Sequence, residues 1–144
     1  MMIRRQISLT SLTLSIFAAS AHAAPVPVAT RRLVMDSCLV TGNDEGAHLF
    51  LAEISSSTFD ANDTGIYVLK KVRLLATSVS DNEHAGIYGV KVIAIGSAID
   101  NNCVTPNLEC GDLVVRRRPR LIDTTCATTF DDLRNTDWNV CSED

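Results

Sequence analysis

Small polar and apolar residues recur along the chain with a period of twenty. Four hydroxyl residues mark the period, and an apolar residue follows each of them two positions later: Ser37 and Leu39, Ser57 and Phe59, Thr77 and Val79, Ser97 and Ile99. A fixed period of this length is typical of a solenoid, in which one repeat cannot bury its apolar face alone and stacks on the next. The pattern therefore predicts an all-β solenoid with repeats over residues 33–102.

Two further apolar columns keep the same spacing. Three positions before the hydroxyl column lie Val34, Ile54, Leu74 and Ala94. Five positions before it, in all repeats but the first, lie Ala52, Val72 and Val92. Offsets that differ by two place both columns on one face of a strand, so we expect interior aliphatic ladders made by equivalent positions of successive coils.

An asparagine column marks a second bend of each repeat. Asn62, Asn82 and Asn102 lie at the same spacing, and Asn43 is displaced from it by one residue. We expect Asn to supply the left-handed backbone of a sharp corner, and stacked carboxamides to hydrogen-bond from coil to coil. Glycines follow the corners and isoleucines open the next strands: Gly46, Gly65 and Gly86, then Ile66 and Ile87.

The repeat resembles that of the right-handed parallel β-helix family, with the form S-x-φ-x-x-N-x-x-x-G-I-x, where φ is apolar, over residues 33–102. The resemblance implies a right-handed parallel β-helix of about five short coils. It also implies a family that includes pectin and alginate lyases, polygalacturonases, epimerases, phage tailspikes, adhesins and secreted proteins with no assigned activity. A fold shared by so many functions does not choose among them.

The N-terminal residues have the pattern of a signal peptide. Arg4 and Arg5 precede a moderately apolar stretch over 7–19, and Ala21-His22-Ala23 has the small-x-small form of a cleavage site. We expect residues 1–23 to be removed on export, residues 24–32 to form a linker, and the protein to be secreted, periplasmic or held at the cell surface. No stretch reaches the roughly 18 apolar residues of a membrane-spanning helix, so we expect no transmembrane segment.

An acidic balance argues against a nucleic-acid partner. Residues 24–144 contain 11 basic and 17 acidic residues, a net charge of −6. Binding to a nucleic-acid backbone needs clustered Lys and Arg, and one such cluster occurs, at Arg116, Arg117, Arg118 and Arg120. We interpret this run as a solvated strand edge, because long basic side chains commonly protect such an edge from further pairing.

The C-terminal third leaves the repeat and holds four of the five cysteines. Five cysteines can form two disulfides in fifteen ways. We expect Cys103 to pair with Cys110 and Cys126 with Cys141, each closing a short loop. Cys38 shares a column with Thr58, Ser78 and Ala98, so we expect it to be the odd thiol at a bend. The segment also resembles the closing coil and cap of secreted bacterial β-helix repeat proteins, with Trp138 as a plug on the open cross-section.

No catalytic or metal-binding set emerges from the sequence. Arg117-Arg118-Pro119-Arg120 approaches the R-x-P-x-x-R element of pectate lyases, but Ile122 takes the place of the second Arg. Asn135-Thr136-Asp137 matches a string of polygalacturonases without its partner motifs, and we interpret it as turn residues. Oxygen ligands for Ca²⁺ could line up at the corners, yet solvated turns explain the same acidic residues better: Asp44, Glu45, Asp60, Asp63, Asp81, Glu83 and Asp100.

Aromatic residues give the sharpest binding hypothesis. Tyr67 and Tyr88 follow Ile66 and Ile87 and should point outward on adjacent coils, with His48 as their equivalent in the first coil. Rings stacked at the coil spacing of about 4.8 Å could form a ladder that stacks on sugar faces, or could cover the sheet surface without a ligand.

These observations leave two function classes. We expect a non-enzymatic secreted structural or interaction module, which could pair with another chain through the open edge of its first coil or be a remnant of a longer β-helix. The alternative is a carbohydrate-binding or polysaccharide-modifying, lyase-like protein. No cofactor is expected in either class.

Overall fold

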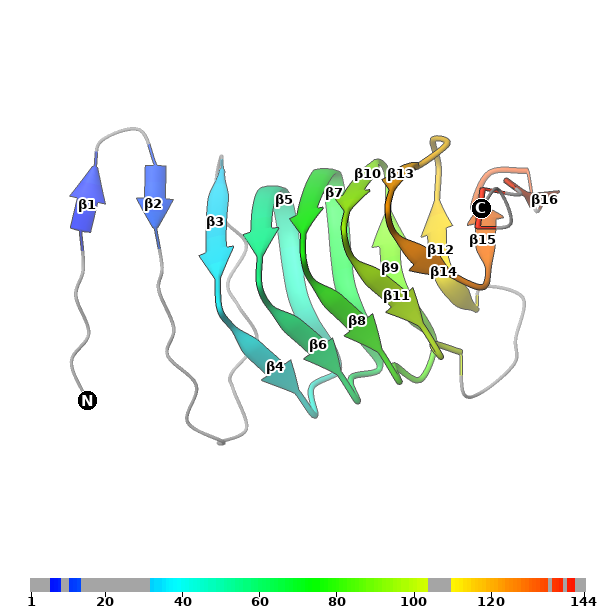
Figure 1. Ribbon diagram of the computed structural model, residues 1–144, viewed down its shortest axis with the longest axis horizontal. Helices are drawn as coiled ribbons and strands as arrows, with labels where there is room; N and C mark the ends of the chain where they lie inside the picture. The colour runs from blue at the N-terminus through cyan, green and yellow to red at the C-terminus, as the bar shows by residue number, and fades with distance from the viewer. Residues whose placement is uncertain are drawn as a thin grey trace.

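The chain forms a parallel β-solenoid of about five turns, as the repeat predicts (Figure 1). The computed structural model describes residues 6–8, 11–13, 32–103, 110–134, 136–138 and 140–141. Each turn contributes one strand to each of three faces, here named faces A, B and C, and each strand pairs in parallel with the equivalent strand of the next turn.

Faces A and C belong to one continuous sheet, because two long strands bend around the corner that joins them. Face A consists of β3 (Leu33–Asp36), the second halves of β5 (Glu45–Ser55) and β7 (Thr64–Leu75), β10 (Val92–Ile95) and β13 (Arg120–Ile122). Face C consists of the first halves of β5 and β7, β9 (Ala85–Gly89), β12 (Gly111–Val115) and β15 (Thr129–Asp131). Face B is a separate sheet of β4 (Leu39–Thr41), β6 (Thr58–Asp60), β8 (Ser78–Ser80), β11 (Ala98–Asp100) and β14 (Thr125–Cys126).

Short strands flank the solenoid at both ends. β1 (Gln6–Ser8) and β2 (Ser11–Thr13) form an antiparallel pair, and β2 pairs in parallel with β3. Both strands fall within the segment predicted to be a signal peptide, and removal of that segment would expose the edge of β3. At the other end, β16 (Thr136–Asp137) pairs antiparallel with β15.

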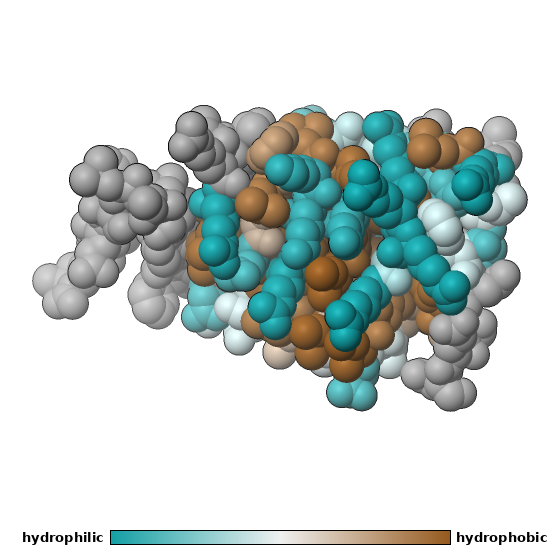
Figure 2. Space-filling view, turned by 90° about the horizontal axis from the view of Figure 1, so that it is seen from above, coloured by the Kyte–Doolittle hydropathy of each residue, from teal (hydrophilic) through white to brown (hydrophobic). Residues whose placement is uncertain are grey.

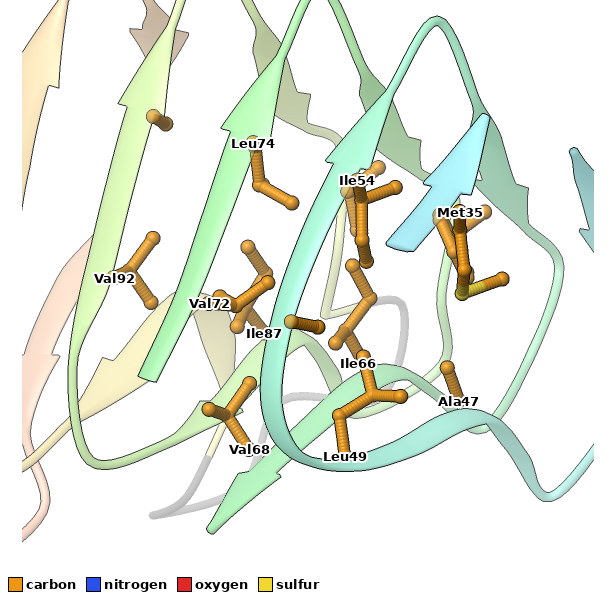
Figure 3. Close-up of a cluster of buried hydrophobic side chains, with 14 of the residues drawn as sticks. Met35, Ala47, Leu49, Ile54, Ile66, Val68, Val72, Leu74, Ile87 and Val92 are labelled. Atoms are coloured by element: carbon orange, nitrogen blue, oxygen red, sulfur yellow. The ribbon is translucent and has the colours of Figure 1, made fainter. Parts of the chain in front are cut away.

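Apolar ladders fill the interior of the solenoid. Val68, Leu74 and Ile87 have no more than 1% of their surface exposed, and side chains from successive turns point toward one another across the coil (Figure 3). The columns of Ile54, Leu74 and Ala94 and of Ala52, Val72 and Val92 are buried as predicted. Burial of such side chains contributes about 25 cal/mol for each Å² of apolar surface and is the main source of stability here.

The first turn differs from the prediction by one residue. Strand β4 pairs with β6 so that Val40 faces Phe59, and β3 pairs with β5 so that Met35 faces Ile54. The first turn is therefore one residue shorter than the next. Met35 and Val40 are buried, whereas Leu39 is 43% exposed, so the assignment of Val34 to an interior column is wrong.

Cys38 occupies the buried hydroxyl column and not the neighbouring bend position. Its backbone N–H donates to Ser57 Oγ at 3.1 Å, as the N–H of Thr77 donates to Ser97 Oγ at 3.2 Å. Its thiol contacts the carbonyl oxygen two residues earlier at 3.5 Å, the bond that Ser57 makes through its hydroxyl at 2.7 Å. Ser37 lies instead at the corner between faces A and B, with a left-handed φ of 53°.

Replacing Cys38 by Ser is expected to change the free energy of unfolding by less than about 1 kcal/mol, because a serine or threonine hydroxyl makes this contact in the other turns. Ser57→Ala provides the contrast, since it removes the acceptor of a buried N–H group and should cost about 2 kcal/mol. Urea denaturation followed by circular dichroism measures both values. A cost of more than about 2 kcal/mol for Cys38→Ser would mean that this position is built for sulfur.

The asparagine column stacks as predicted, but its backbone is not left-handed. The left-handed φ belongs to the preceding residue of each turn: Gly42, Ala61, Asp81 and Asn101. The buried carboxamides instead bind the next turn, because the N–H groups of Asn62 and Asn82 donate to the Oδ1 atoms of Asn82 and Asn102 at 3.1 and 3.2 Å. Each of these amides also holds two carbonyl groups of the coil, which fixes the corner between faces B and C.

A carboxylate on β12, in the fourth turn, ends the asparagine ladder. Asp112 is 1% exposed, and its Oδ1 accepts from both the backbone and the side-chain nitrogen of Asn102. Its Oδ2 accepts the N–H groups of Ala127 and Thr128 at 2.8 and 3.0 Å. Asp112 therefore accepts from Asn102 the two hydrogen bonds that the next asparagine accepts in earlier turns.

Two disulfides lie near the C-terminus, between Cys103 and Cys110 and between Cys126 and Cys141. Both predicted pairs are confirmed, and Cys38 belongs to neither. Trp138 packs against the core cluster, and its indole N–H donates to the Val115 carbonyl at 3.1 Å. Trp138 thus packs over the C-terminal end of the apolar interior.

Candidate interaction surfaces

Three aromatic side chains form a column on the outer surface of face C. His48 pairs in register with Tyr67, and Tyr67 with Tyr88, so the three residues occupy one position of three successive turns. All three are partly exposed, which agrees with the predicted outward direction. The column continues into Val114 and Phe130 of the next two turns.

The rings of this column stack on one another. The ring centroids of Tyr67 and Tyr88 lie 5.3 Å apart at an angle of 20°, and those of His48 and Tyr67 lie 4.6 Å apart at 38°. Both faces of the Tyr67 ring therefore turn toward neighbouring rings, an arrangement worth about 1 kcal/mol for each pair. A sugar would meet ring edges and hydroxyl groups here, so glycan stacking at His48, Tyr67 and Tyr88 stays a prediction.

A small polar network closes the column near the C-terminal end. The hydroxyl of Tyr88 donates to Asp132 Oδ1 at 2.8 Å, and Arg116 Nε donates to Asp132 Oδ2 at 2.7 Å. Burial alone would raise the pKa of Asp132, but these two hydrogen bonds outweigh it and hold the pKa below its usual value. The hydrogen bond to Asp132 in turn raises the pKa of Arg116. Both groups are ionised at neutral pH.

The corner between faces B and C is acidic, as the sequence indicates. A shallow groove of about 490 Å³ runs along it, and Asp44, Asp63, Asp81 and Glu83 are among its lining residues. Two of the acidic side chains nearby have histidine partners, since Glu45 contacts His48 at 2.7 Å and Asp63 contacts His84. Among the described residues no three His, Cys, Asp or Glu side chains are close enough together to hold a metal ion.

The corner between faces C and A has the opposite charge, and we call it the basic corner. Every Lys and Arg in the described part of the chain lies either on its turns or on or beside face A. The turns contain Lys70, Lys71, Lys91, Arg116, Arg117, Arg118 and Arg134, and face A adds Arg32, Arg73 and Arg120. The acidic and basic corners lie on opposite sides of the coil, at the bottom and the top of Figure 1.

The interpretation of the arginine run as a solvated strand edge holds for Arg120, which is exposed on β13, a strand that among the described strands pairs with β10 alone, but not for residues 116–118. Residues 116–119 form the turn between β12 and β13, because the N–H groups of Arg116 and Arg117 donate to the carbonyls of Gly89 and Val90 in the preceding turn. Backbone hydrogen bonds of this kind join successive turns of the basic corner, and they hold its side chains at the coil spacing of about 4.8 Å. The four arginines of the run therefore belong to one turn of a basic array that extends over several turns.

The remaining sequence candidates are not brought together into one site. Tyr88 approaches the arginine turn through Asp132, whereas the acidic groove lies across the coil from the basic corner. Asn135 lies outside the described residues, and Asp137 accepts a hydrogen bond from Thr129 at 2.6 Å in the closing hairpin. No described helix is long and apolar enough to cross a membrane.

Stacked parallel faces, an asparagine ladder and a disulfide-bonded end define this chain as a parallel β-solenoid of about five turns. Comparison with known proteins finds no matching family model, no similar curated protein and no similar solved structure.

Proposed function

We propose that this chain is an exported, non-enzymatic interaction module that binds an extended anionic partner along its basic corner. The observation that carries the proposal is the separation of charge, with the described Lys and Arg residues on the basic corner and face A and an acidic corner opposite. The charge of this array selects the partner, and the fold serves as the scaffold that holds the array in place. On the repeat motif, we place the solenoid with the right-handed parallel β-helices.

Three basic side chains of the corner are available to a partner. Among the described residues, Lys71, Lys91 and Arg117 form no ion pair, whereas Arg116 and Arg134 pair with Asp132 and Asp131. The acidic corner weakens this attraction little, because charges are screened over about 8 Å at physiological ionic strength. A protein with a net negative charge can therefore present a locally positive edge.

The module is rigid, which suits it to present side chains at a fixed spacing. Buried carboxamides and backbone hydrogen bonds lock the turns together, so the corner does not have to be ordered when a partner binds. A pre-formed array loses less entropy on binding than a flexible one. Carbohydrate binding at the aromatic column is the alternative, and it has less support because the ring faces turn toward one another.

Retention on a dextran sulfate column in a salt gradient tests the proposal. The protein should elute well above the salt concentration that releases a typical acidic protein, and Lys71→Ser, Lys91→Ser and Arg117→Ser together should abolish retention at physiological salt. The matched control is Thr41→Glu with Ser78→Glu and Thr125→Glu, which changes the net charge by the same amount on face B. Equal loss of retention in both triple variants would show that net charge, and not the corner, decides binding.

A further inference from the structure

We propose that the partner of the basic corner is a membrane surface rich in anionic lipids. The inference rests on the proposed function and goes further by naming the partner. It follows from the apolar residues that share the corner with the cations. Figure 2 looks onto the corner from above and shows long hydrophilic side chains gathered over it with hydrophobic surface between them.

Three of the four large hydrophobic residues that are exposed in the described chain lie on the basic corner. Phe50 is 38% exposed, Leu69 is 42% exposed and Leu133 is 71% exposed. They belong to the corner turns that follow the face C strands of the first, second and fifth coils. Single exposed hydrophobic residues need no explanation, but their concentration among the cations gives the edge a mixed basic and apolar character.

The apolar and basic groups of the corner lie next to one another. The ammonium group of Lys70 lies 5.5 Å from the centroid of the Phe50 ring, and Leu69 directly precedes this lysine. Lys71 and Lys91 follow at successive turns, and a backbone hydrogen bond from Val72 to the carbonyl of Lys91 holds those turns together. At Phe50 and Leu69 the cations therefore lie beside the exposed apolar side chains instead of occupying a separate patch.

This combination distinguishes between the anionic partners that the proposed function allows. A sulfated or phosphorylated polymer in solution would satisfy the cations and leave Phe50 and Leu69 in water. An anionic membrane accepts both, because apolar side chains enter the boundary between headgroups and acyl chains while Lys and Arg reach the phosphates through their flexible stems. The corner would lie on the membrane with the acidic corner facing away from it.

Co-sedimentation with vesicles tests the inference. The probes are vesicles of phosphatidylcholine alone and vesicles in which phosphatidylglycerol replaces part of it, each mixed with the full oxidised chain. We expect binding to be at least about tenfold tighter on the anionic vesicles, and Phe50→Ser with Leu69→Ser to weaken it by about tenfold. Leu39→Ser is the matched control, because Leu39 is the fourth exposed hydrophobic and lies on face B.

Each outcome of this experiment supports or overturns the inference. All variants keep the same N-terminal residues, so any membrane affinity of the predicted signal segment is common to them, and circular dichroism verifies the fold. Equal binding to both vesicles, or equal binding by the wild type and the Phe50 and Leu69 double variant, would overturn it. If dextran sulfate still retains the protein, its partner is a soluble polyanion and the proposed function stands. If the protein binds neither the anionic vesicles nor dextran sulfate, the proposed function is overturned as well.

Discussion

Replacing Asn82 by Ala is expected to lower the free energy of unfolding by about 4 kcal/mol. The buried amide donates to the carbonyls of Phe59 and Ser80 at 3.2 and 3.0 Å and to Asn102 Oδ1 at 2.7 Å. Its oxygen accepts both the backbone and the side-chain nitrogen of Asn62 at 3.1 Å. Alanine satisfies none of these groups, and each buried polar group left unpaired costs about 1–3 kcal/mol.

Asn43→Ala is the control for this prediction, since it lies in the same column at the half-buried end of the ladder. Water can replace its amide, so we expect a cost of about 1 kcal/mol. Urea denaturation of the oxidised protein, followed by circular dichroism, gives both values. An equal loss of unfolding free energy in the two variants would mean that water reaches the whole asparagine ladder and that the ladder does not hold the central turns together.

The central turns could be predicted from sequence because their period is strict. Phe59, Val79 and Ile99 are buried at intervals of twenty, and backbone hydrogen bonds join each turn to the next, so equivalent residues stay in register. In such a stack a column of the sequence becomes a column of the structure. The same strictness allowed the outward direction of Tyr67 and Tyr88 to be inferred.

The hydroxyl column predicts a first turn that is one residue out of register, although the sequence contains a signal for the correct one. Ser37 matches the hydroxyl column by residue type, and Cys38 does not, so residue type favoured the wrong alignment. Asn43 is displaced by one residue in the sequence, and in the structure its N–H donates to Asn62 Oδ1 as in the other turns. The one-residue displacement of Asn43 therefore indicates the register of the whole first turn.

The carboxylate that ends the asparagine ladder and the basic corner could not be derived from the repeat. Residue 112 aligns with the glycine column, and its carboxylate is tolerated because Ala127 and Thr128 supply donors that no earlier turn offers. The basic corner combines residues more than sixty positions apart, from Lys70 to Arg134. The basic residues share no sequence motif. Only their equivalent positions in successive turns show that they form one edge of the solenoid.

Replacing Gly65 by Ala is expected to lower the free energy of unfolding by about 3 kcal/mol. A Cβ atom at this position would lie 2.6 Å from the Gly86 carbonyl oxygen, 2.9 Å from the Asn82 amide nitrogen and 2.9 Å from a methyl group of Val79. None of these neighbours can move without disturbing the next turn, because Asn82 is fixed by five hydrogen bonds within the ladder. The glycine column thus leaves room for the asparagine column.

Gly96→Ala separates this packing effect from the general cost of replacing a glycine. A Cβ atom at Gly96 would have nothing within 4 Å, and its φ of 56° is close to that of Ala76, at 47°, in the preceding turn. We expect it to cost no more than about 1 kcal/mol. Thermal or urea denaturation of both variants gives the comparison. Similar costs at the two positions would mean that the next turn shifts to accept the Cβ atom, and that its close approach does not require glycine at position 65.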